Sequence, residues 1–202
     1  MNTVKIYPTD LTDSEWAIFE GFLPKAKSCS GCSGRPTIDV RQVINGIFYL
    51  NKTGCQWRMM PVDFGHWNSI YHYFRKWQKT NIWNNAMQRL NQMERKRQGK
   101  QTHPSAGCVD SQSVKTVTQG NQVGFDGGKK IDGRKRHILV DTMGLILTVL
   151  ISAANMGERR GFKELLLDYF ADGVKRLRYI WLDAGYSGNP LKEWVFLLKK
   201  TW

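Results

Sequence analysis

The chain has 202 residues, of which 41% are hydrophobic, enough to form one large or two small packed domains. The 30 lysines and arginines exceed the 17 acidic residues, and the net charge of +13 favours nucleic acid as a partner over an anionic membrane. There is no apolar run of about 18 residues and no secretory signal pattern. We therefore expect no membrane association and a cytoplasmic, nucleoid-associated location.

Four cysteines are too few and too scattered for a disulfide framework, so we expect reduced thiols. Cys29 and Cys32 have half of the spacing of a zinc site, but no second Cys or His pair follows at a suitable distance. His66 and His72 fall in a different predicted helical region. We interpret the segment around Cys29 and Cys32 as a flexible Ser/Gly loop.

The first 98 residues predict a domain of helices. Residues 12–15 (TDSE) fit a capping box at the start of one helix. Residues 39–51 and 66–79 have apolar side chains on one helical face, and residues 81–97 predict a further helix. Short helices with tight turns and basic outer faces are typical of a helix-turn-helix module that binds DNA.

The helix predicted over residues 66–79 has two unlike faces. The aromatic face is better explained by core packing than by stacking on bases, and it contains Trp67, Tyr71, Phe74 and Trp77. The opposite face carries three basic residues that are candidate DNA contacts, Arg75, Lys76 and Lys79. An ordinary solvated helix face would have the same composition, so this alternative stays open.

Residues 99–106 are polar and contain Gly and Pro, which predicts a linker before a second domain over residues 107–202. In that domain we expect strands through Asp110 and over residues 136–140, 145–153 and 177–182. Helices are expected at 160–170 and from Asn189 to residue 200. This order predicts an α/β domain with a mixed sheet, whose fourth strand follows a crossover helix.

Two apolar runs each end on an aspartate, Asp110 and Asp183. A right-handed crossover places the fourth strand beside the first, so the two carboxylates can become neighbours. Neighbouring carboxylates repel each other, and Mg²⁺ binds one or two carboxylates together with phosphate oxygens. The pair therefore predicts a divalent-metal site acting on phosphodiesters, although either aspartate alone could simply cap a strand.

Several longer motifs resemble the transposases of small bacterial insertion sequences, the IS-five family of the DDE type. The motifs of the second half are VDSQSVK at 109–115, GFDGGKK at 124–130, GRKRHILVDT at 133–142 and WLDAGYSG at 181–188. In the first half, IFYL at 47–50 and TGCQWRMMP at 53–61 are similar to the same family. The resemblance covers nearly the whole chain, and its motifs occur in the family's order.

The resemblance implies a ribonuclease H-like catalytic domain preceded by a helical DNA-binding domain, acting with Mg²⁺ or Mn²⁺ to cut element ends and join them to target DNA. It matches Asp110 and Asp183 to the first two acids of the catalytic triad. The expected partner is double-stranded DNA at the element ends, and a homo-oligomer is a possible form. A run of basic residues has two possible roles: it binds the phosphates of a DNA strand, or it is the solvent-exposed face of a hairpin. The run consists of Lys129, Lys130, Arg134, Lys135, Arg136 and His137.

The chain departs from the family after the third strand, where residues 155–161 (NMGERRG) exchange an acid for a base, and again after Asp183, where nothing matches the family's third acid. Glu193 is interpreted as a surface residue of the last helix. We therefore expect a C-terminally truncated or degenerate copy, with an incomplete sheet domain, that is inactive alone. Two alternatives stay open: a DNA-binding regulator that competes for element ends without catalysis, and a small metal-dependent nuclease using Glu193 or Glu158.

Overall fold

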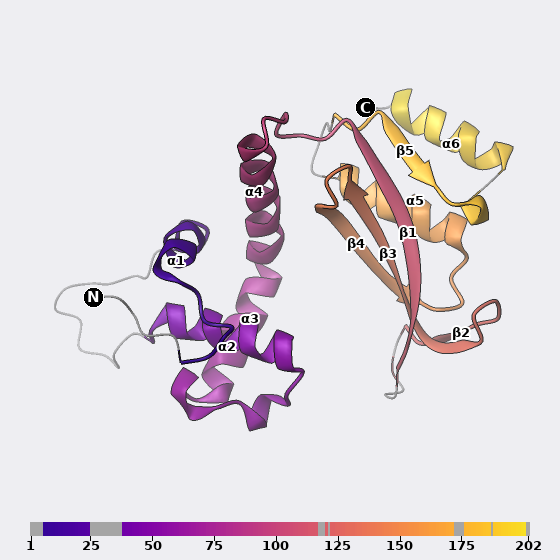
Figure 1. Ribbon diagram of the computed structural model, residues 1–202. Helices are drawn as coiled ribbons and strands as arrows, with labels where there is room; N and C mark the ends of the chain where they lie inside the picture. Colours follow the sequence, from indigo (N-terminus) through magenta and orange to yellow (C-terminus); the bar gives the residue numbers. More distant parts are fainter. Residues whose placement is uncertain are drawn as a thin grey trace. The chain divides into compact units, whose positions relative to one another are not determined.

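The computed structural model describes residues 6–24, 38–116, 120, 122–171, 176–186 and 188–200. The chain forms two compact units, Met1–Leu90 and Asn91–Trp202. Their elements are labelled in Figure 1. Cys29 and Cys32 lie outside the described residues, so the predicted loop around them stays a prediction.

The first unit is helical, as the sequence predicts. The capping box is confirmed, because Thr12 accepts from the Glu15 amide and the Glu15 carboxylate accepts from the Thr12 amide. The second helix begins after Asp39, whose carboxylate accepts from the Arg41 amide, and ends at Gly54 in the left-handed region at φ +69°. The elements are α1 (Asp13–Glu20), α2 (Val40–Thr53), the 3₁₀ turns η1 (Trp57–Met59) and η2 (Val62–Phe64), α3 (Trp67–Lys79) and the first turns of α4 (Ile82–Arg97).

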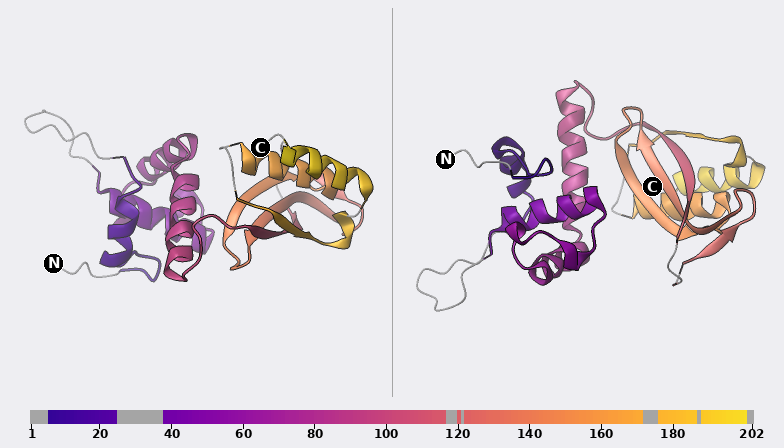
Figure 2. Two further views of the ribbon diagram at one scale, coloured as in Figure 1. Left: turned by 90° about the horizontal axis from the view of Figure 1, so that it is seen from above. Right: turned by 60° about the horizontal axis from the view of Figure 1, so that its bottom comes forward.

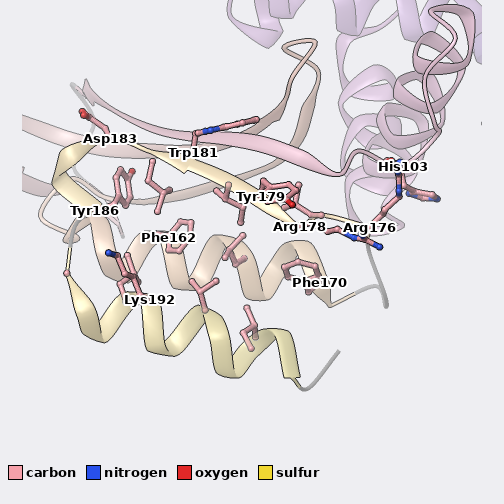
Figure 3. A pocket seen from close by; sticks show the side chains of 18 of the residues that line it. His103, Phe162, Phe170, Arg176, Arg178, Tyr179, Trp181, Asp183, Tyr186 and Lys192 are labelled. Carbon is pink, nitrogen blue, oxygen red and sulfur yellow. Dashed lines mark hydrogen bonds between the residues drawn. The ribbon is translucent and has the colours of Figure 1, made fainter.

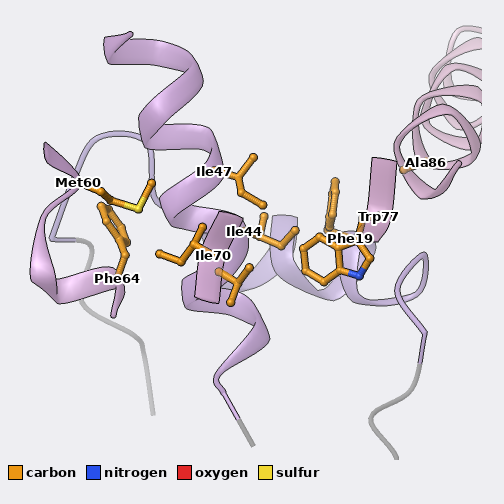
Figure 4. Packing of buried hydrophobic residues seen from close by; sticks show 9 residues of the cluster. Phe19, Ile44, Ile47, Met60, Phe64, Ile70, Trp77 and Ala86 are labelled. Atoms are coloured by element: carbon orange, nitrogen blue, oxygen red, sulfur yellow. The ribbon is translucent and has the colours of Figure 1, made fainter. Parts of the chain in front are cut away.

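The core of this unit is formed by buried side chains from several helices (Figure 4). Trp77 of α3 is buried, and Trp67 and Phe74 pack against the same core. Tyr71 lies at the edge, 38% exposed, with its ring 5.0 Å from that of Trp57. The prediction that the aromatic face packs in the core is confirmed for three of its four residues.

The second unit contains β1 (Ala106–Lys115), β2 (Gly124–Asp126), β3 (Ile131–Asp141), β4 (Ile146–Ala153), α5 (Glu158–Phe170), β5 (Tyr179–Leu182), the 3₁₀ turn η3 (Ala184–Tyr186) and α6 (Asn189–Lys200). β3 pairs antiparallel with β1, β2 and β4, and β1 pairs in parallel with β5. The mixed sheet and the order of its main elements are as predicted. The short strand β2 was not predicted, because its glycine-rich sequence has no alternating apolar pattern.

Helices α5 and α6 lie on the same face of this sheet (Figure 2). The core under them contains Val109, Leu139, Phe162 and Leu165. Along β1, buried and exposed residues alternate, with Val109 buried and Asp110 exposed. The sheet therefore has one face covered by helices and one face that presents Asp110.

The two compact units divide inside α4, whereas the sequence predicts a boundary at residue 98. The last turns of α4 belong with the sheet because the Arg95 guanidinium pairs with the Asp141 carboxylate at the end of β3. Its Nε also donates to the Gln101 carbonyl at 2.7 Å. Helix α4 is continuous across the boundary between the two units, because its residues have favourable helix propensity as far as Arg97.

Candidate active site

The two aspartates singled out from the sequence lie at the ends of neighbouring strands. β1 and β5 run parallel with Val109 opposite Leu182, and Asp110 and Asp183 are the next residues on each strand. The predicted adjacency of the two strand ends is confirmed. Parallel neighbours in register project to the same face, and both aspartates are exposed.

The local structure around each aspartate directs its carboxylate to the open face. Figure 3 shows Asp183 and Trp181 on the side of β5 opposite Phe162 and Lys192. The Asp110 Oδ1 accepts from the Ser111 amide at 2.7 Å. After Asp183 the chain turns back through η3, where the Asp183 carbonyl accepts from the Tyr186 amide at 3.0 Å.

This turn is held by Tyr186, whose ring packs edge-on against Phe162 of α5 at 5.9 Å. Burial is the main cause that raises the pKa of the Tyr186 hydroxyl. The negative charges of Glu158, Asp110 and Asp183 raise it further, whereas Ser111 lowers it. Glu158 of α5 lies on the helix-covered side of β1, with its Oε1 3.5 Å from the Ser111 Oγ.

The donor set suits a hard divalent cation, because Mg²⁺ and Mn²⁺ prefer carboxylate oxygens and are commonly held by one or two of them. Among the described residues, no group of three or more Asp, Glu, His or Cys side chains is arranged to hold an ion. Asp110 and Asp183 are the two candidate ligands that the sequence and the strand register bring together.

The basic run starts in a hairpin that is organised by Asp126. The Asp126 carboxylate accepts from the Gly128 and Lys129 amides at 3.0 and 3.1 Å, and from the Ser113 hydroxyl at 2.5 Å. It also pairs with the Lys135 ammonium at 3.2 Å. These contacts, led by that of Ser113, hold the pKa of Asp126 well below its usual range.

Two members of the predicted phosphate-binding run do not lie on the surface. Lys135 is buried, and its Nζ donates to the Met156 carbonyl as well as pairing with Asp126. His137 is fully buried, with its Nε2 3.1 Å from the Ser152 Oγ. The expectation that these two side chains contact DNA is therefore corrected: β3 alternates, and both residues project toward the helix-covered face.

The other members of the run are accessible to different degrees. Lys129 and Lys130 are exposed in the turn before β3, and the Lys129 Nζ donates to the Ser111 carbonyl at 3.1 Å. Arg134 and Arg136 alternate with the buried residues of β3, and Arg136 is exposed opposite Gln112. Since Asp110 pairs with Ile138, Arg136 lies diagonally from Asp110 on the same face of the sheet.

The three basic candidates of α3 belong to the other compact unit. Arg75, Lys76 and Lys79 are all exposed. The Arg75 guanidinium donates to the Gln78 side chain at 2.8 Å, and the Lys76 ammonium lies 5.9 Å from the centre of the Tyr73 ring. Their exposure leaves them available to a ligand, and DNA contact by these residues stays a prediction.

A cavity of about 1140 Å³ lies between β5, α5 and α6, on the helix-covered side (Figure 3). Its wall is mostly apolar and includes Phe162, Leu166, Leu182 and Leu191. Asp183 belongs to its rim, but its carboxylate points to the other face of β5. The cavity therefore differs from the exposed carboxylate pair on the other face of the sheet.

Two family models match this chain. A putative transposase of the IS4/5 family matches residues 11–87, and a transposase DDE domain matches residues 101–201, half of the chain. The chain belongs to the DDE transposase family. The resemblance inferred from the sequence motifs is thereby confirmed, and with it a function in DNA transposition.

A relative of this transposase-family chain is the "Insertion element IS402 uncharacterized 16.2 kDa protein" of Burkholderia cepacia. The two are 28% identical over 117 residues, which are 56% of this chain and 78% of the relative. No solved structure matches the chain. A DDE transposase domain acts on DNA and generally uses divalent metal ions. None of the helices in the described residues has the length and apolar character needed to cross a membrane.

The DDE domain brings together residues whose proximity the sequence does not reveal. Glu158 was considered from the sequence only as one alternative acid, and Gly185 and Tyr186 only as parts of a motif. In the structure, the Glu158 Oε1 lies 3.5 Å from the Ser111 Oγ, and the Tyr186 amide donates to the Asp183 carbonyl at 3.0 Å. A signal was present in the motif WLDAGYSG, because a glycine soon after a strand-end aspartate often allows another group to approach closely.

Proposed function

We propose that the second unit has a ribonuclease H-like fold and carries out metal-dependent cleavage and joining of DNA strands at the ends of an insertion element. The observation that carries this proposal is the parallel register of β1 and β5, which makes Asp110 and Asp183 adjacent on one exposed face. A duplex is too wide to enter a closed pocket, so an exposed pair of carboxylates suits this substrate.

In this proposal Asp110 and Asp183 hold Mg²⁺ or Mn²⁺. The bound ion supplies electrophilic stabilisation of the phosphate and activation of the attacking oxygen. The amide of Ser111 restrains the Asp110 carboxylate through a 2.7 Å hydrogen bond. Restraint of this kind matters because small errors in the position of a ligand cost large factors in rate.

Basic residues near the aspartates bind the phosphate backbone in the same proposal. Arg136 lies on the face of Asp110, and Arg134 lies two residues before it on the same strand. Lys129 and Lys130 extend from the turn that precedes β3. Contacts of this type position the substrate and do not read its sequence.

The helical unit binds double-stranded DNA at the element ends in this proposal. Its exposed basic side chains on α3 support it, namely Arg75, Lys76 and Lys79. Neutralisation of backbone phosphates by such side chains makes binding strongly dependent on salt.

The test combines metal binding with cleavage by the full chain. Mn²⁺ binding is measured by titration calorimetry and by the rise in melting temperature, for the native chain and for Asp110→Asn and Asp183→Asn. Asp132→Asn is the matched control, because Asp132 is also an exposed aspartate on a strand of this sheet. We expect binding to be lost in the first two variants and kept in the control.

Cleavage of labelled element-end duplex is then measured with Mn²⁺. Cleavage that is lost in Asp110→Asn and Asp183→Asn supports the catalytic assignment. DNA binding without cleavage would instead favour the role of a regulator that competes for element ends. Metal binding that survives in both aspartate variants would show that the site is elsewhere.

A further inference from the structure

Helix α3 of the first unit has an outer face that takes no part in the core. Its inner face is anchored by Ile70 and Trp77, which are 0% and 2% exposed (Figure 4). Spacings of four, three and four residues align four exposed polar side chains along the outer face. We call this set the α3 stripe; it consists of Asn68, His72, Arg75 and Lys79.

The side chains of the α3 stripe keep hydrogen-bonding groups available for a ligand. Within the described part of the chain, the Asn68 amide group and the His72 imidazole form no side-chain hydrogen bond. The Arg75 Nη1 donates to the Gln78 Oε1 at 2.8 Å, which restrains the guanidinium and leaves its other N–H groups for a ligand. The stripe therefore presents directional donors and acceptors in addition to positive charge.

These residue types match the edges of bases in the major groove of DNA. Arginine donates two hydrogen bonds to guanine O6 and N7, and asparagine forms two hydrogen bonds with adenine N6 and N7. The major groove is about 12 Å wide and admits an α-helix. The stripe extends over about 16 Å, because each helical residue rises about 1.5 Å. Side chains on successive turns of α3 can therefore meet different base pairs.

Positive charge beside the α3 stripe favours DNA as the partner. Helix α3 contains no acidic residue, and Lys76 is exposed next to the stripe. The guanidinium of the exposed Arg58 in η1 lies 5.6 Å from the centre of the Trp67 ring, at the start of α3. A contact with an aromatic ring holds a guanidinium in place without neutralising it. Arg58 and Lys76 are therefore suited to bind the phosphates that flank a groove.

The other helices of this unit present less suitable faces. Helix α1 carries Asp13 and Glu15 in its first turn, and their charges oppose a phosphate backbone. Helix α2 is largely covered and exposes only residues 51–53, in its last turn. The part of α4 in this unit exposes Asn85 and Arg89, which makes it the competing helix.

We propose that α3 enters the major groove of the element-end DNA and reads its sequence, with Asn68, His72 and Arg75 contacting base edges. Arg58 and Lys76 contact the flanking phosphates. Phosphate contacts position a protein on DNA, whereas contacts with base edges give specificity. The inference rests on the proposed binding of DNA by the helical unit and adds the residues that determine which sequence is bound.

The experiment selects duplexes with the full chain from a library that has a randomised core, and sequences the enriched duplexes. Asn68→Ala removes the amide group, and Arg75→Lys keeps the positive charge but loses the planar fork of donors. We expect each variant to lose the preference at the base pair that the native residue contacts. The native chain should bind the enriched duplex about 10-fold more tightly than a duplex changed at that base pair. The variant should bind both duplexes equally.

Asn85→Ala and Arg89→Lys are the matched controls, because both residues are exposed on α4 within the same unit. They should leave the enriched motif unchanged. A motif that changes in these two variants, and stays the same in Asn68→Ala and Arg75→Lys, would assign sequence readout to α4 and overturn the inference. All four side chains are exposed, so the melting temperature should equal that of the native chain in each variant.

The outcomes separate this inference from the proposed function. If the native chain binds duplex but enriches no motif, α3 does not read sequence, and binding through phosphates stands. The same conclusion follows if Asn68→Ala and Arg75→Lys both enrich the native motif. If the native chain binds no duplex even at low salt, the proposed DNA binding and the readout by α3 are both wrong.

Discussion

Arg95 in the last turns of α4 and Asp141 at the end of β3 form a buried ion pair. The side chains are 7% and 0% exposed, respectively. The Asp141 Oδ1 also accepts from the amides of Met143 and Leu145, at 2.8 and 2.9 Å. The pair therefore connects the end of α4 to the turn between β3 and β4.

Replacement of Arg95 by Met should destabilise the second unit strongly, because Asp141 would keep a buried charge without its main partner. The expected loss in free energy of unfolding is about 3 to 5 kcal/mol. Arg97→Met is the control, since Arg97 lies two residues away, is 71% exposed and pairs with Glu94 on the surface. Its expected loss is much smaller, because ion pairs exposed to solvent contribute little to stability. Urea denaturation measures both, and equal losses would contradict the structural role of Arg95.

His137 should make the second unit less stable at mildly acidic pH. Burial is the main cause that lowers its pKa, the charge of Lys135 lowers it further, and Glu164 opposes both. The unfolded chain therefore binds a proton at higher pH than the folded chain. The contribution of neutral His137 is complete above about pH 6.5, the pKa of an unfolded histidine, and is lost as pH falls from there toward the folded pKa.

The measurement is the melting temperature of the full chain between pH 8 and pH 5. In His137→Gln the melting temperature should fall less on acidification than in the native chain. His72 is exposed, so His72→Gln should leave this fall in melting temperature unchanged. An identical pH dependence for the native chain and His137→Gln would show that His137 does not titrate differently in the two states.

Gly161→Ala should destabilise the packing of α5 on the sheet. A Cβ at position 161 would lie 2.1 Å from the His137 Cε1, and the ring is fully buried, so neither group can move freely. Overpacking of this kind costs about 1 to 3 kcal/mol. In a His137→Ala background the same substitution should cost much less, because the obstructing ring is gone. Chemical denaturation of the four chains gives the coupling energy, and additive losses would contradict the predicted clash.

DNA binding by the full chain should depend steeply on salt. A plot of log affinity against log salt concentration has a slope set by the number of phosphates neutralised. Replacing Arg75, Lys76 and Lys79 together by Gln should flatten this slope by about one unit for each residue that contacts phosphate. Arg97→Gln is the control, because Arg97 already pairs with Glu94. An unchanged slope in the triple variant would show that the basic face of α3 is ordinary solvated surface.

The expectation that the chain is inactive by itself stays a prediction. The same is true of the catalytic and DNA-binding roles of individual residues. Strand transfer by the purified chain would contradict the prediction of inactivity. Loss of that activity in Glu193→Gln would support Glu193 as the third acid of the site.

The sequence alone determined the family, the order of the main elements and the adjacency of Asp110 and Asp183. Each aspartate ends an apolar run, and the handedness of a crossover limits where the next parallel strand can lie. The β1–β5 register agrees with this argument. These features depend on local pattern and chain connectivity, both of which are present in the sequence.

Only the tertiary structure decided which residues of β3 are accessible. Its basic residues occupy both faces of the strand, so composition alone could not show that Arg136 is exposed while Lys135 and His137 are buried. The contact of Glu158 with Gly185 likewise joins residues from α5 and η3 that are distant in the sequence. Which face of a sheet a helix covers, and which side chains meet there, follow from packing between distant segments, and this packing is not encoded in any local pattern.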